Sequence, residues 1–218
     1  MFESKYSGFL TALLIIIIIG IVGLLGYLGY SYYQEYNINR STSDFVDSFM
    51  EEVGDGEEGT GEGGGELNAI EGTPVTSADV TTYKGFNVVG TIEIPATDLK
   101  YPILEKVTKA SIEAAVAVLY GPGPNQPGNT VIAGHNYRNG LFFSNNKNLE
   151  TGDKVYITDM SGNKVTYTIY NKFEAAENDT SFFNRDTQGG REVTLSTCTD
   201  DSKARIIIEA RADEDGAV

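Results

Sequence analysis

An uncharged run near the N-terminus limits the possible folds more than any other feature of the sequence. The 23 residues from Gly8 to Tyr30 carry no charge and are dominated by leucine, isoleucine and valine. As a helix with a rise of about 1.5 Å per residue, this run would extend about 34 Å, against a bilayer core of about 30 Å. We therefore predict a membrane-spanning anchor at residues 8–30 and expect the folded domain to lie after it.

A cleaved secretory signal is the competing interpretation of this run. Its apolar region would be about 7 to 15 residues long and would end in a small-x-small site. Here tyrosines at positions 27, 30, 32 and 33 follow the apolar core, and such side chains suit the boundary between membrane and water. Lys5 precedes the run and Glu35 follows it, so the charges favour residues 1–7 in the cytoplasm and the rest of the chain outside the cell.

The segment 31–84 has the composition of a flexible linker. Between Ser41 and Tyr83 there are 11 acidic residues and no basic one, with seven glycines from Gly54 to Gly65. Repulsion between like charges and the entropy of glycine oppose a packed structure, so we expect a spacer with one short helix around residues 44–52. The rest of the chain holds 20 acidic and 16 basic residues, without a basic patch that would indicate a nucleic-acid partner.

Residues 85–212 have the size and pattern of one folded domain, followed by a short tail at 213–218. Short segments rich in β-branched and alternating apolar residues recur between Pro and Gly positions. The predicted strands are Val88–Ile94, Leu99–Leu104, Thr130–Gly134, Lys154–Asp159, Lys164–Phe173, Glu192–Cys198 and Ala204–Ala210. Closely spaced strands of this kind predict a mainly β fold, a closed or nearly closed β-barrel.

Three connections between these strands have recognisable signals. Gly162 and Asn163 tolerate positive φ and predict a hairpin turn at residues 160–164. Ser111–Leu119 is predicted to be a helix, with Ser111 as its cap and an alanine-rich body. Residues 141–149 are predicted to form a second, shorter helical turn, so one or two short helices accompany the barrel.

The chain has one cysteine and one histidine, Cys198 and His135, and each stands at the end of a predicted strand. A thiolate is a strong nucleophile, and imidazole exchanges protons near neutral pH. Taken alone, such a cysteine is more often a small buried hydrophobe and such a histidine a structural residue. The polar turn that follows Cys198 places the thiol near solvent, as a reactive cysteine requires, and this favours a catalytic pair.

Hairpin geometry brings a third residue to this pair. If the turn after Cys198 is centred on residues 201–202, antiparallel pairing places Arg205 directly opposite Cys198, with Cβ atoms about 4.5 to 5.5 Å apart. A guanidinium there can favour the thiolate and can hold a carbonyl or its developing oxyanion. The alternative is an ordinary surface pair between Arg205 and Asp200 or Asp201, and the spacing alone leaves both open.

A recognisable motif surrounds these residues. Thr194-Leu-Ser-Thr-Cys198 is followed seven residues later by Arg205, and Ala133-Gly-His135-Asn136 places the histidine 63 residues before the cysteine. From about Val88 to Ala212 the chain thereby resembles the sortase family of cysteine transpeptidases. The anchor and linker fit this resemblance, because sortases are held at the outer face of Gram-positive bacterial membranes.

The resemblance implies an eight-stranded β-barrel and a role for each residue of the motif. Cys198 would attack the Thr-Gly carbonyl of a Leu-Pro-x-Thr-Gly-like sorting signal on a secreted surface protein and form a thioacyl intermediate. His135 would protonate the leaving amine, and Arg205 would bind the substrate backbone and stabilise the oxyanion. Thr197 would line the signal-binding groove. An amine of a cell-wall precursor or of a pilin would then accept the acyl group.

The subclass stays open between B-like and D-like sortases. The connection at residues 174–191 is too short for the long helix of class B, although Gly134-His-Asn-Tyr137 resembles that class. We find neither the Asp-Pro-aromatic lid nor the second membrane span typical of pilin-polymerising class C members. This favours anchoring of surface proteins to the cell wall over pilus assembly.

No cofactor is predicted. Glu174, Glu177 and Asp179 resemble the loop carboxylates through which some sortases bind calcium, but three nearby acidic residues more often form a solvated surface. The sequence shows no motif for zinc, a nucleotide or a flavin.

Two other classes of function remain open. One is a different membrane-anchored Cys-His enzyme, such as a cysteine protease, which hydrolysis without amine transfer would indicate. An L,D-transpeptidase is disfavoured because its Ser-x-Gly-Cys context does not match Leu195-Ser-Thr-Cys198. The other class is a non-catalytic β-domain displayed on a spacer.

Overall fold

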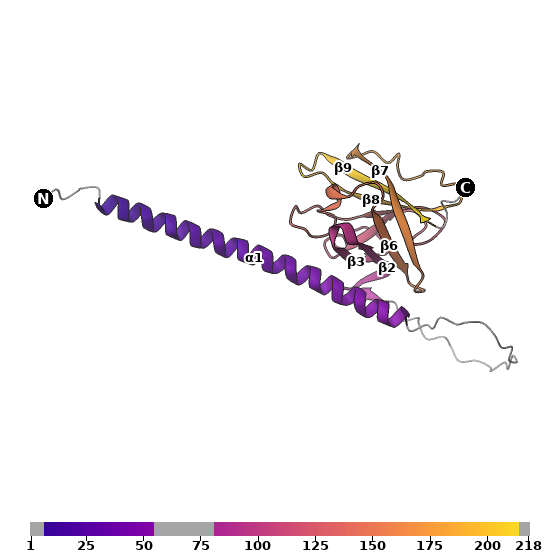
Figure 1. Ribbon diagram of the computed structural model, residues 1–218, viewed down its shortest axis with the longest axis horizontal. Helices are drawn as coiled ribbons and strands as arrows, with labels where there is room; N and C mark the ends of the chain where they lie inside the picture. Colours follow the sequence, from indigo (N-terminus) through magenta and orange to yellow (C-terminus); the bar gives the residue numbers. More distant parts are fainter. Residues whose placement is uncertain (1–6, 55–80, 214–218) are drawn as a thin grey trace. The chain divides into compact units, whose positions relative to one another are not determined.

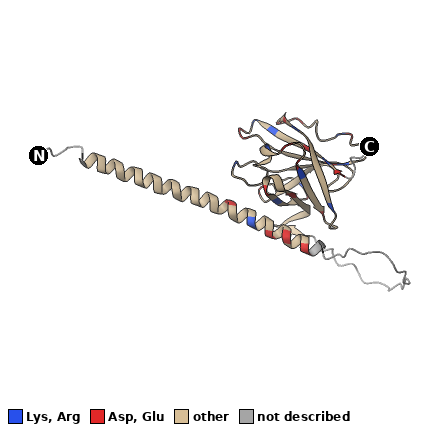
Figure 2. Cartoon of the chain, viewed as in Figure 1, with Lys and Arg blue, Asp and Glu red and all other residues tan. Residues whose placement is uncertain are grey.

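The computed structural model describes residues 7–54 and 81–213, which form two compact units. Helix α1, Ser7–Gly54, begins in the first unit, Met1–Arg40, and ends in the second, Ser41–Val218. Its first half carries no charged residue (Figure 2), and side chains such as Ile16 (66% exposed) are open to the surroundings. Among the described residues, the Gly8–Glu51 part of α1 is the one helix long and apolar enough to cross a membrane.

The helix continues well beyond the predicted anchor, so the prediction of a flexible linker is wrong for residues 31–54. The glycines on which that prediction rested begin only at Gly54. Before it, Val46 and Phe49 recur on one helix face and are buried, and Phe45 contacts Tyr83 edge-on with ring centroids 5.0 Å apart. The short helix expected around residues 44–52 is the end of the long helix α1. The rest of the predicted linker up to residue 80 lies outside the described residues.

The second unit is built on a β-barrel. Apart from β1 (Thr82–Tyr83), its strands are β2 (Phe86–Ile94), β3 (Leu99–Leu104), β4 (Val116–Tyr120), β5 (Gly128–Ala133), β6 (Lys154–Asp159), β7 (Lys164–Ala176), β8 (Arg191–Cys198) and β9 (Ala204–Ala212). In the described part of the chain, the strands follow the order β2-β3-β4-β5-β8-β9-β7-β6, and pairing of β6 with β2 closes the ring of eight (Figure 1). The two-residue β1 extends the sheet beside β2. The predicted eight-stranded barrel is confirmed.

Two strand pairs in the barrel are parallel, β3 with β4 and β5 with β8, and the others are antiparallel. Apolar side chains at alternate positions fill the interior, including the fully buried Ile92, Ile132 and Leu195. Burial of both the strand backbones and these side chains fixes the register, because a shift by one residue would turn every side chain to the other face.

The predicted helix at Ser111–Leu119 is wrong. The Ser111 hydroxyl does act locally, because it accepts a hydrogen bond from the Thr108 amide over 2.7 Å and donates to the Lys106 carbonyl over 2.8 Å. Only one turn follows, and from Val116 onward the chain forms β4 between β3 and β5. Pairing of this segment with β3 and β5 in the barrel wall outweighs the helix propensity of its alanines.

The other predicted connections are present. The hairpin between β6 and β7 pairs Thr158 with Lys164, and Gly162 takes the positive φ of 81° that the turn requires. The expected helical turn within residues 141–149 is the 3-10 helix η2, Asn146–Asn148. A second 3-10 helix, η1 (Pro95–Thr97), joins β2 to β3.

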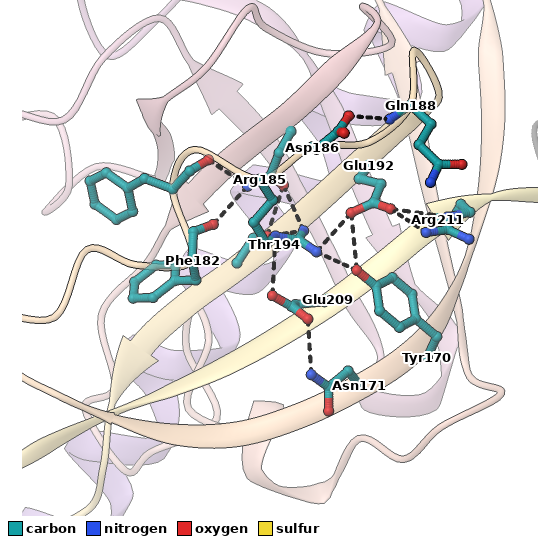
Figure 3. Close-up of polar contacts among 12 residues, drawn as sticks. Tyr170, Asn171, Phe182, Arg185, Asp186, Gln188, Glu192, Thr194, Glu209 and Arg211 are labelled. Carbon is teal, nitrogen blue, oxygen red and sulfur yellow. Dashed lines mark hydrogen bonds and ion pairs between the residues drawn. The ribbon is translucent and has the colours of Figure 1, made fainter.

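A buried polar network attaches the connection between β7 and β8 to the outer face of the barrel (Figure 3). Arg185 lies at its centre, with Nη1 2.8 Å from a carboxylate oxygen of Glu192 on β8 and Nε 3.2 Å from one of Glu209 on β9. Its Nη2 donates to Asn129 on β5 and Thr194 on β8, both over 3.1 Å. The two carboxylate side chains are only 2% and 6% exposed, so Arg185 compensates charges that water cannot reach.

Other side chains complete this network. Arg211 donates twice to Glu192, over 3.0 and 2.8 Å, and Asn171 donates to Glu209 over 2.9 Å. Tyr170 donates to Glu192 over 3.0 Å, and burial raises the pKa of this phenol to about 12 despite the opposing effect of Arg185. Tyr170 therefore stays protonated as a donor across the physiological pH range.

We expect Arg185→Met to lower the free energy of unfolding of the barrel by about 3 to 5 kcal/mol, because it leaves buried carboxylates without their central cation. Lys203→Met is the matched control, since the Lys203–Asp201 pair is 3.8 Å long and its side chains are 83% and 59% exposed. Urea unfolding of the full chain in detergent, followed by the near-ultraviolet circular dichroism of its tyrosines, measures both variants. Equal unfolding midpoints for the two would contradict the assignment of Arg185 as the centre of the network.

Candidate active site

The parallel pair β5–β8 brings the two candidate catalytic residues to one edge of the barrel. Ala133 is paired with Ser196 at the end of the shared ladder, and the Gly134 amide donates to the Ser196 carbonyl over 3.1 Å. His135 follows two residues after Ala133, and Cys198 two residues after Ser196. Because both strands run in the same direction, these residues emerge at the same end.

Gly134, between β5 and His135, is required by packing. A Cβ at this position would lie 2.8 Å from a ring carbon of Phe143 and 2.9 Å from a methyl group of Val116. The Phe143 amide also donates to the His135 carbonyl over 3.0 Å. These close contacts fix the backbone from which the imidazole projects.

Cys198 and Arg205 face each other across the hairpin of β8 and β9, as the spacing predicted. Arg205 Nη1 donates to Cys198 Sγ over 3.1 Å. Its Nη2 is 3.0 Å from Glu177, rather than from Asp200 or Asp201 as the surface alternative required. Cys198 is a free, partly exposed thiol, so the cation beside it can stabilise a thiolate that solutes can reach.

The role expected for Thr197 conflicts with its position. Its side chain points to the opposite face of β8 from Cys198, is 3% exposed, and donates to the Gly134 carbonyl over 2.7 Å. A side chain so buried offers almost no surface to a substrate. Instead of lining a groove, Thr197 ties the end of β8 to the residue before His135.

Asn136 is a site residue that the sequence reasoning missed. Its side-chain amide donates to the Cys198 carbonyl and to the Asp200 carboxylate, both over 2.9 Å. Asp200 also accepts from Lys147 over 2.7 Å, and these hydrogen bonds, that from Lys147 foremost, lower the pKa of the Asp200 carboxyl. The carboxylate is therefore ionised at neutral pH, and its contribution is lost as the pH falls through this lowered pKa. In the sequence, the one indication that Asn136 belongs to the site is its position directly after His135.

His135 itself is held by aromatic contacts. The Tyr137 ring stacks on the imidazole at a centroid distance of 4.8 Å and an interplanar angle of 25°, and Phe142 approaches it edge-on at 6.3 Å. The Glu113 carboxylate lies 3.4 Å from His135 Nε2. The arrangement thus supplies a nucleophile, a neighbouring cation and a proton-exchanging ring, the groups that acyl transfer needs.

The carboxylates considered for calcium do not converge. Glu177 pairs with Arg205, and Asp179 accepts from the Ser181 amide over 2.8 Å within its own turn. Within residues 7–54 and 81–213, no group of three or more His, Cys, Asp or Glu side chains is arranged to hold a metal ion.

We expect Asn136→Ala to loosen the turn after Cys198. Loss of two hydrogen bonds worth about 1 kcal/mol each should speed amide hydrogen exchange of Thr199 and Ser202 about tenfold or more. Mass spectrometry of the full chain in detergent measures this, with Asn87→Ala as the control because Asn87 also donates one side-chain hydrogen bond, to Glu105, at an exposed position. Unchanged exchange in residues 199–204 would show that Asn136 does not hold the turn.

Known proteins resemble this chain in sequence and fold over the part that contains the site. A sequence model of the sortase domain matches residues 92–213. Sortase A of Bacillus anthracis is 30% identical over 124 residues, which are 55% of this chain and 58% of that protein. Sortase A of Listeria monocytogenes is 29% identical over 112 residues, 51% of this chain and 49% of that protein.

A solved structure of a Clostridium perfringens Sortase D5 transpeptidase superposes with a TM-score of 0.53 and 28% identity, covering 58% of this chain and 79% of that structure. The chain matches less than two thirds of the length of either curated relative. The family model nevertheless covers more than half of the chain, and with it every residue of the motif around Cys198. The chain belongs to the sortase family.

Proposed function

We propose that this protein is a membrane-anchored sortase that cleaves a Leu-Pro-x-Thr-Gly-like sorting signal between Thr and Gly and joins the surface protein to an amine of the cell wall. The observation that carries this proposal is the 3.1 Å contact between Arg205 and the Cys198 sulfur, at the barrel edge where His135 also emerges. Membership of a family of cysteine transpeptidases supports the reaction class.

The first half of the reaction forms a thioester. The Cys198 thiolate attacks the threonine carbonyl carbon, and the electron pair of the C=O bond moves onto oxygen. When the tetrahedral intermediate collapses, the C–N bond breaks, and His135 gives a proton to the leaving amino group of glycine. In the second half an incoming amine attacks the thioester, His135 takes its proton, and the thiolate leaves.

Arg205 serves both halves in this proposal. Nη1 stabilises the thiolate before attack, and the guanidinium donors hold the oxyanion as negative charge moves from sulfur to oxygen. Nη2 is engaged with Glu177 at rest, but the Glu177 side chain is 69% exposed. Such an ion pair contributes under about 1 kcal/mol, so a substrate carbonyl can displace it at little cost.

The long apolar helix suits a membrane anchor. We propose that residues 8–30 span the membrane once, with residues 1–7 in the cytoplasm and the barrel outside the cell. This places the site where sorting signals of secreted proteins and wall precursors meet. The partners are therefore polypeptides and amines, with no nucleic acid.

The reaction is tested with the full chain in detergent and a panel of Leu-Pro-x-Thr-Gly-type peptides, with and without glycine or diaminopimelate. We expect mass spectrometry to show an acyl adduct on Cys198, resolved to a new amide when amine is added. Cys198→Ala should abolish both, and Arg205→Lys should lower kcat/KM about 100-fold or more, since it loses the forked donor geometry.

Other products would redirect the assignment. Release of free acid only, at every amine concentration, would indicate a cysteine protease. Covalent ladders with purified pilin subunits would indicate a pilin-polymerising sortase. Full biological activity of Cys198→Ala would indicate a non-catalytic display domain.

The membrane topology can be tested separately, because Cys198 is the only native cysteine that has to be removed before labelling. In a Cys198→Ala background we expect Thr76→Cys to react with a membrane-impermeant maleimide on intact cells, and Ser4→Cys to react only after lysis. The opposite labelling pattern would place the barrel in the cytoplasm and refute the proposed location.

A further inference from the structure

The inner nitrogen of the His135 ring lacks a hydrogen bond. Nε2 is buried and makes none within the described part of the chain, although imidazole nitrogens shielded from water are normally paired. The charged group beside it is the Glu113 carboxylate, with Oε1 at 3.4 Å. This distance is slightly longer than a hydrogen bond, and catalytic contacts of this kind tighten when substrate binds.

Glu113 is held on a rigid turn before β4. Ser111, 2% exposed, fixes this turn through its contacts with Lys106 and Thr108, and its carbonyl accepts from the Ala114 and Ala115 amides over 2.9 and 3.1 Å. Both alanines are buried under the barrel wall. The backbone that carries Glu113 therefore has little freedom to move away from His135.

Tyr137 aligns the carboxylate with the ring. Its hydroxyl donates to Glu113 Oε2, while its ring stacks on His135, so one side chain contacts both partners. Burial, followed by the hydrogen bond with Glu113, raises the pKa of Tyr137 to about 12, so the phenol keeps its proton and remains a donor. With Oε2 occupied in this way, Oε1 is directed at His135.

We propose that Glu113 is a positioning residue for His135: it accepts the Nε2 proton and leaves Nδ1 to exchange protons with the substrate amines. This rests on the proposed function, in which His135 is the acid and base of the transfer. Which ring nitrogen carries the proton in a neutral histidine is set by the hydrogen bond that the other nitrogen makes. In this arrangement the moving proton passes only between Nδ1 and the amine. The site is then a Cys-His-Glu triad, with Arg205 as the oxyanion donor.

The ring can be observed directly because His135 is the only histidine in the chain. In ¹⁵N-histidine NMR of the full chain in detergent, we expect the neutral ring to be protonated at Nε2 in the wild type. In Glu113→Ala the protonation should shift toward Nδ1. We also expect kcat to fall about tenfold or more with KM changed less than about twofold, because the ring is misoriented while the binding surface is intact.

Two variants separate positioning from general damage. Glu113→Asp should restore part of the Nε2 signal and of kcat, since it keeps the carboxylate. Glu150→Ala removes an exposed carboxylate outside the site and should leave tautomer and kcat as in the wild type. A Glu113→Ala enzyme with the wild-type tautomer and wild-type kcat would overturn the proposal. Because the NMR measurement needs no turnover, a wild type that fails to process any peptide would count against the proposed function and leave the Glu113 contact still testable.

Discussion

The site depends on the parallel pairing of β5 with β8. Six residue pairs, from Gly128 with Arg191 to Ala133 with Ser196, align two segments more than sixty residues apart in the sequence so that both end at the same edge. A slip of one residue would turn Cys198 toward the interior and Thr197 toward the outside. The buried Leu195 and Ile132 make such a slip costly, so core packing sets the place of the thiol.

The outer face of β8 and β9 carries both the thiol and the buried ion pairs. At one end Cys198 meets Arg205, and at the other Glu192 and Glu209 meet Arg185 from the β7–β8 connection. That connection is thus tied down by buried charges far from the thiol and by an exposed ion pair, Glu177 with Arg205, beside it. In the proposed reaction a substrate can open the near contact without disturbing the far one, because an exposed pair contributes far less to stability than a buried one.

Local patterns predicted the barrel and the facing positions of Cys198 and Arg205 because both follow from strand alternation and hairpin counting. They failed where distant residues decide the outcome. Most of the helix predicted at Ser111–Leu119 is instead turn and the strand Val116–Tyr120, because the partners of this strand come from β3 and β5. The charge compensation around Arg185 joins four elements and leaves no short motif. The groove-lining role implied for Thr197 conflicts even with strand alternation, which sets Thr197 on the opposite face from Cys198.

The three groups of the proposed reaction differ in how firmly the fold holds them. Cys198 and Arg205 sit on paired strands, whereas His135 lies just beyond β5, beside an isolated bridge that pairs Asn136 with Phe142. An imidazole on such a segment cannot be oriented by a strand ladder, so its orientation must come from side chains. Stacking by Tyr137 fixes the ring plane but not the rotation that exchanges its nitrogens. A charged acceptor on one nitrogen supplies that missing constraint, and Glu113, on a turn fixed independently by Ser111, is placed to do so.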